Sequence, residues 1–199
     1  MALTFIAEIS ANDTDTENLV FSGIPQTYTS LRLMGIGNTS YALSQGFNGV
    51  FALQFNEDTA ALKNSYARQA TNNSSVLSNS AGTFNASYGQ CGSMSGTTPD
   101  DGYYPATYII DIYNYKGEST YGDVQYFSRS VNATASNNYS HTAYFAGTYK
   151  NQTTAITSLQ LKSGSGNWLR YSKFSLYGRD WWQPRLTYWS KLLWLQVLL

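Results

Sequence analysis

Alternation of apolar and polar side chains is the feature that most constrains the fold, and it is clearest in residues 155–178 (AITSLQLKSGSGNWLRYSKFSLYG). Leu159 and Leu161 alternate with polar neighbours, and after a glycine- and serine-rich interval Phe174 and Leu176 do the same. A period of two residues is typical of a β-strand, because successive side chains then point to opposite faces. The segment predicts two strands joined as a hairpin. An isolated hairpin is only marginally stable in water, so this one must belong to a larger sheet that packs against a second layer.

The same alternation recurs along the chain and predicts further strands. These runs cover residues 3–9, 19–21, 28–35, 48–56, 65–70, 103–115, 120–131 and 141–150. Residues 48–56 are apolar on both faces, which predicts a central strand, whereas a turn of helix is expected only around residues 60–63. Roughly eight to ten short strands with almost no helix favour an all-β fold, an antiparallel jelly-roll-like β-sandwich.

The length and composition of the chain predict one main domain, residues 1–178. A chain of 199 residues without repeats or a proline-rich linker is long enough for a single core. Its 12 basic and 12 acidic side chains balance, so the chain has no electrostatic footprint for a nucleic acid, and none is expected as a partner. The N-terminal residues (MALTFIAEIS) lack the basic and long apolar regions of a secretory signal and are interpreted as a first strand.

Residues 71–101 differ from the rest of the domain because they are mostly Ser, Asn, Thr and Gly. Such a composition buries little apolar area, so it predicts a long surface excursion with at most one edge strand. If the chain recognises a ligand through a variable loop, this segment is the expected place for it.

Residues 179–199 (RDWWQPRLTYWSKLLWLQVLL) form a second segment, a Trp/Leu-rich C-terminal arm. Charged side chains interrupt it, so a membrane span is not predicted. An exposed segment this apolar would aggregate, which favours an arm that packs on a neighbouring subunit; the outside of its own sheet and an interfacial membrane anchor are the alternatives. The predicted assembly residues are its four tryptophans: Trp181, Trp182, Trp189 and Trp194.

Reactive groups are few. The single histidine, His141, lies in a predicted strand, and the single cysteine, Cys91, is interpreted as an ordinary buried or loop thiol. No His or Cys pair has metal-ligand spacing, and no glycine cluster is followed by a phosphate-binding lysine. We therefore assign no catalytic, cofactor-binding or metal-binding residue, expect no cofactor, and do not expect an enzyme.

Carboxylates offer two weaker alternatives. Asp13, Asp15 and Glu17 have the alternate spacing of a calcium loop but lack its glycine and distant glutamate, which favours a solvated loop. A glycoside hydrolase would need two facing carboxylates, and nothing selects such a pair. The candidates for that pair are Asp100, Asp101, Asp111 and Asp123.

Binding suits the composition better than catalysis. The chain has 17 tyrosines, and tyrosine with Ser, Asn and Gly on loops gives amphipathic contact area suited to sugar or protein recognition. The alternative is that most tyrosines occupy half-buried strand positions, as their β propensity predicts.

Several short segments resemble a known group of proteins. They are MALTFIAEIS at the start, FSGIPQTY (21–28) with SLRL (30–33), LQFN (53–56), AITSL (155–159) and FSLYG (174–178). Over residues 1–178 the chain resembles small virion-associated proteins of tailed bacteriophages, especially those of aquatic hosts. The resemblance implies a place on the virion and carries no catalytic residue; it does not extend into residues 179–199.

The resulting hypothesis is a bacteriophage virion structural protein, a trimeric surface component of the particle (fibre, tail or head decoration) that acts by assembly with other virion proteins. The first alternative is a carbohydrate- or receptor-binding adhesion module of the phage tail that binds a host surface glycan. The second is a glycan hydrolase.

Overall fold

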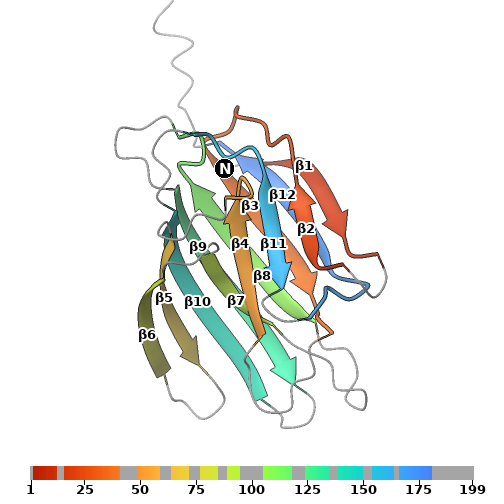
Figure 1. The fold of residues 1–199 in the computed structure, drawn as a ribbon, viewed down its shortest axis with the longest axis vertical. Coiled ribbons are helices and arrows are strands. Elements are labelled where there is room, and N and C mark those ends of the chain that lie inside the picture. The colour runs from red at the N-terminus through yellow and green to blue at the C-terminus, as the bar shows by residue number, and fades with distance from the viewer. Residues whose placement is uncertain are drawn as a thin grey trace, which may run out of the picture.

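The fold is built entirely from β-strands over the part of the chain that the structure, a computed structural model, describes. These residues are 2–12, 16–40, 49–58, 64–71, 77–84, 89–94, 105–117, 124–134, 139–149, 154–163 and 166–180. They form twelve antiparallel strands in two sheets, and the smaller sheet lies across one face of the larger (Figure 1). The predicted all-β sandwich is confirmed. The helical turn expected at residues 60–63 lies outside the described residues.

The larger sheet has eight strands and the smaller has four. In spatial order the larger contains β1 (Leu3–Ser10), β12 (Lys173–Arg179), β3 (Ser30–Gly37), β8 (Ala106–Tyr113), β9 (Val124–Thr134), β10 (Tyr139–Tyr149), β5 (Asn64–Thr71) and β6 (Leu77–Phe84). The smaller contains β2 (Asn18–Phe21), β11 (Leu159–Ser163), β4 (Gly49–Phe55) and β7 (Gly89–Met94).

The strand pairing is nested in the manner of a jelly roll. Strand β1 pairs with β12 and β3 with β8 in the larger sheet, whereas β2 pairs with β11 and β4 with β7 in the smaller one. Early strands therefore meet late strands alternately in the two sheets, which is the double Greek key of a jelly roll. Strands β9, β10, β5 and β6 extend the larger sheet beyond β8.

The predicted hairpin in residues 155–178 is wrong, because β11 belongs to the smaller sheet and β12 to the larger. Between them the chain crosses from one layer to the other through Trp168, which is fully buried. Its backbone N–H donates to the carbonyl of Thr16 (2.8 Å), and its indole N–H donates to the carbonyl of Leu161 (3.2 Å). Burial of this large ring between the sheets, with its polar groups satisfied, favours the crossing over a tight hairpin.

Trp168 lies in the aromatic centre of the core. Its ring is 5.5 Å from that of Phe51 on β4 and 5.2 Å from that of Phe174 on β12, between ring centroids, and both contacts are edge-to-face. Tyr108 on β8 contacts the same Phe51 ring at 4.7 Å. Both sheets thus meet on one cluster, and Phe174 points inward as its alternation predicts.

The prediction of at most one edge strand in residues 71–101 is also wrong, since both β6 and β7 lie there, each at the end of its sheet. Strand β7 pairs with β4, and Cys91 within it is fully buried. The large side chains that fill this part of the core come from β4, where Phe51 and Leu53 are fully buried. A partner strand of small residues can therefore complete the sheet without large apolar side chains of its own.

The central position predicted for residues 48–56 is confirmed, because β4 lies between β11 and β7.

Candidate functional site

The outer face of the eight-stranded sheet, the face turned away from the smaller sheet, carries an unusual set of side chains. Cross-strand register places Phe5, Tyr177, Arg32, Asp111 and Phe127 in one row across β1, β12, β3, β8 and β9. Directly opposed residues in antiparallel strands project from the same face. The row therefore runs continuously across five strands, with two aromatic side chains at one end, an ion pair in the middle and an aromatic side chain at the other end.

Large apolar side chains remain exposed on this outer face. Phe5 is 57% exposed and Phe127 is 46% exposed. Of the seven large hydrophobic side chains exposed among the described residues, five project from the outer face: Leu3, Phe5, Ile36, Phe127 and Tyr144. Single exposed apolar residues are normal on a protein surface, but a set gathered on one sheet face is typical of an interaction surface.

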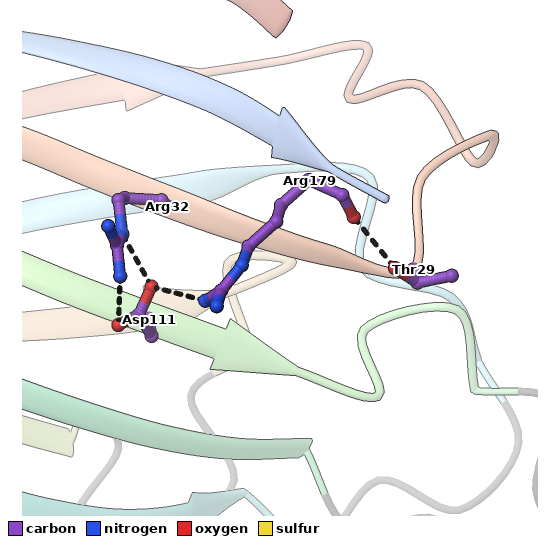
Figure 2. Close-up of polar contacts among 4 residues, drawn as sticks. All are labelled: Thr29, Arg32, Asp111 and Arg179. Atoms are coloured by element: carbon purple, nitrogen blue, oxygen red, sulfur yellow. Dashed lines mark hydrogen bonds and ion pairs between the residues drawn. The ribbon is translucent and has the colours of Figure 1, made fainter. Parts of the chain in front are cut away.

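An ion cluster lies in the middle of the row (Figure 2). The Arg32 guanidinium donates two parallel hydrogen bonds to the Asp111 carboxylate, Nε to Oδ1 at 2.7 Å and Nη2 to Oδ2 at 2.8 Å. Arg179 Nη1 lies 3.4 Å from the same Oδ1, and Asp111 is only 13% exposed. The two-point contact raises the pKa of Arg32, chiefly through the hydrogen bonds to Asp111.

The C-terminal end of β12 is fixed beside this cluster. The carbonyl of Arg179 accepts hydrogen bonds from the Thr29 hydroxyl (2.7 Å) and the Thr29 backbone N–H (3.1 Å), and Figure 2 shows the hydroxyl contact. The chain therefore leaves the sandwich from a rigid point next to Asp111. Residues 181–199 follow from there, so the predicted assembly residues Trp181, Trp182, Trp189 and Trp194 lie outside the described residues.

An open pocket of about 700 Å³ lies at the other end of β12. It is bounded by the end of β1, by β3 and by the turn that precedes β12, and that turn carries Arg170 and Tyr171. The side chains that line it include Ser10, Asn12, Ile36, Arg170, Tyr171 and Lys173. Lys173 also binds Glu8, with Nζ 2.7 Å from Oε1. The pocket thus combines an aromatic ring with several hydrogen-bonding groups.

The reactive groups singled out in the sequence gather into no common site within the described residues. Cys91 is fully buried, as an ordinary core thiol should be, and burial raises the pKa of its thiol well above the usual range. Asp111 is held by arginines, and its proposed partners Asp100, Asp101 and Asp123 lie outside the described residues.

The other candidate ligands lie only partly within the described residues. His141 falls in β10, and Asp13 and Asp15 lie outside the described residues. Among the residues that the structure covers, no three His, Cys, Asp or Glu side chains group as a metal site. These residues form no helix long and apolar enough to cross a membrane.

Sequence reasoning missed both the ion cluster and the pocket. Asp111 was a visible signal, because it is the one charge in an apolar strand (YIIDIY) and occupies an outward position. Arg32 stands in an equivalent place in SLRL, 79 positions away in the chain. No protein-family model, curated protein or solved structure matches this chain. Its functional interpretation therefore depends on the geometry of these two surfaces.

Proposed function

We propose that this protein is a bacteriophage virion structural protein, a trimeric surface component of the particle that acts by assembly with copies of itself and with other virion proteins. The observation that supports this most is the outer face, where Phe5, Phe127 and their neighbours are exposed around a shielded ion cluster. The resemblance of residues 1–178 to virion-associated phage proteins supports a place on the virion. The jelly roll is also common among viral capsid proteins.

The ion cluster suits a surface that becomes covered. Asp111 is already shielded in the single chain and satisfied at both oxygens by Arg32. A partner that covers the row therefore buries an ion pair that is already satisfied, which costs less than burial of an unpaired charge. The aromatic side chains supply the apolar area of the contact.

The C-terminal segment of a neighbouring subunit is the proposed occupant of the outer face. It holds four of the five tryptophans and leaves β12 beside Asp111. Nineteen residues follow position 180 and extend up to about 63 Å, while eight strands side by side span only about 38 Å. An arm-to-face contact can pass from subunit to subunit around a closed ring, and we propose a ring of three subunits.

Mass spectrometry of purified particles of the encoding phage tests whether the protein is part of the virion. The protein is expected in fixed stoichiometry, with about a dozen copies or fewer for a tail position and far more for head decoration. Absence of the protein from purified particles would contradict the proposal.

Replacement of Trp181, Trp182, Trp189 and Trp194 by serine tests the arm. The variant is expected to lose the oligomer that the natural chain forms. Its only remaining tryptophan is Trp168, so the blue-shifted emission of a buried indole reports that the core is intact. The control replaces Gln183 and Gln196 in the same segment by serine and should keep the oligomer. An unchanged oligomer in the four-serine variant would show that the arm is not the assembly element.

A further inference from the structure

The turn before β12 presents a tyrosine in a conformation that tyrosine does not favour. Residues Leu169 to Ser172 form a tight turn, closed by a hydrogen bond from the Ser172 N–H to the Leu169 carbonyl (3.0 Å). Tyr171, its third residue, has a φ of 76° and is 68% exposed. This left-handed region costs a side chain about 1 kcal/mol or more and is the usual place of glycine. Neither the backbone nor the core requires a tyrosine there.

The turn is held firmly in place. The Leu169 N–H donates to the Asn38 carbonyl (2.9 Å), and the Ser172 hydroxyl donates to the same carbonyl (3.1 Å) while it accepts from the Asn38 N–H (3.0 Å). The Ala11 N–H donates to the Ser172 carbonyl (2.9 Å), and Ser172 is almost fully buried. The exposed tyrosine is therefore mounted on a rigid support, which lowers the entropy cost of binding through it.

Neighbouring side chains orient the Tyr171 ring and place hydrogen-bonding groups around it. The Arg170 guanidinium carbon lies 5.1 Å from the Tyr171 ring centroid, a cation–π contact that fixes the ring orientation and leaves most of the residue exposed. Asn12 and Ser10 line the same pocket with groups that both donate and accept, and Arg170 and Lys173 add donors. Its volume of about 700 Å³ lies within the range of small-ligand sites.

We propose that this pocket is a saccharide-binding site in which the C–H face of a pyranose ring stacks on Tyr171. The hydroxyl groups of the sugar exchange hydrogen bonds with Asn12 and Ser10 and accept from Arg170 and Lys173. A polyhydroxylated ring matches this combination because it has one apolar face and a rim of groups that donate and accept. The site lies at the end of β12 away from the exit of the C-terminal segment, and it shares Ile36 with the outer face.

The test is saturation-transfer NMR and calorimetry on the full chain with glucose, galactose, N-acetylglucosamine and glucuronic acid as probes. At least one of these is expected to bind at millimolar concentration. Tyr171→Gly should weaken that binding about tenfold or more because it removes the stacking platform. Its melting temperature should not fall, since glycine suits a φ of 76°. Val20→Ala, which removes an exposed apolar side chain on the smaller sheet, is the control and should bind as the natural chain does.

Three results would overturn the proposal: none of the probes binds, Tyr171→Gly binds as tightly as the natural chain, or Tyr171→Gly lowers the melting temperature or the oligomeric mass. In the last case the tyrosine is a structural or assembly residue. These measurements use purified protein only, so their failure leaves the proposed virion role unaffected.

Discussion

The two faces of the eight-stranded sheet carry the same kinds of side chain in opposite environments. On the inner face Tyr108 and Phe174 are buried against each other, whereas on the outer face Phe5 and Phe127 are about half exposed. Aromatic residues favour strands on either face, so strand propensity alone does not explain the outer set. The inner face stabilises the chain, and we infer that the outer face acts only when another surface covers it.

The largest expected effect is on the inner face, at Trp168. Trp168→Ala removes the ring on which both sheets meet and should lower the free energy of unfolding by about 3–5 kcal/mol. Phe127→Ala on the outer face should lower it by less than about 1 kcal/mol in the single chain. Urea unfolding under conditions that keep the chain monomeric measures both. Equal losses would contradict the division of roles between the faces.

A smaller effect is expected where the backbone approaches an aromatic ring. A Cβ on Gly35 would lie 2.4 Å from the Lys173 carbonyl oxygen and 2.4 Å from Phe174 Cδ1, so Gly35→Ala forces β3 and β12 apart. We expect a loss of about 1–3 kcal/mol in thermal or urea unfolding. Gln125→Ala, an exposed change on the outer face, serves as the control and should stay within about 0.5 kcal/mol. A tolerated Gly35→Ala would mean that the two strands are less closely packed than described.

The ion cluster on the outer face should contribute less than the core. Asp111→Asn keeps the shape but removes the negative charge that pairs with Arg32 and lies beside Arg179, and we expect a loss of about 1 kcal/mol in the single chain, because the arginines are partly solvated. A double-mutant cycle with Arg32→Gln isolates the coupling between the two side chains. A coupling near zero would show that the pair does not stabilise the chain.

The smallest expected effect is at the exposed pair of Glu8 and Lys173. The hydrogen bond from Lys173 lowers the pKa of Glu8 below its ordinary value of 4.5. A lowered pKa in the folded chain adds stability above pH 4.5, and this contribution is lost as the pH falls through the folded value. The melting temperatures of the natural chain and of Glu8→Gln should therefore differ slightly near neutral pH and converge in acid or at high salt. A difference that grows in acid would contradict this assignment.

Much of the fold could be predicted from local pattern, but the partners of strands could not. Alternation correctly predicts that Leu159, Leu161 and Leu176 point inward, since the side-chain period fixes the face. It does not reveal that β11 and β12 lie in different sheets. That depends on the burial of Trp168 between layers and on its hydrogen bond to Thr16, contacts far apart in the sequence.

The candidate sites were harder to predict, for the same reason. Arg32 and Asp111 become neighbours only through the pairing of β3 with β8, which no local pattern specifies. The positive φ of Tyr171 depends on anchors from Asn38 and Ala11, so the sequence around Tyr171 gives no sign of it. Composition indicated residues 71–101 as the place for any recognition loop, and it gave no sign of the pocket at the crossing between β11 and β12.

Light scattering of the natural chain and of the variant Phe5→Ser with Phe127→Ser is the most direct test of the outer face as an assembly surface. The natural chain should have three times the 22.1 kDa mass of one chain, and the variant should have the mass of one chain with little change in monomer stability. A natural chain of 22.1 kDa at every concentration, or a variant that keeps the full oligomer, would contradict the account.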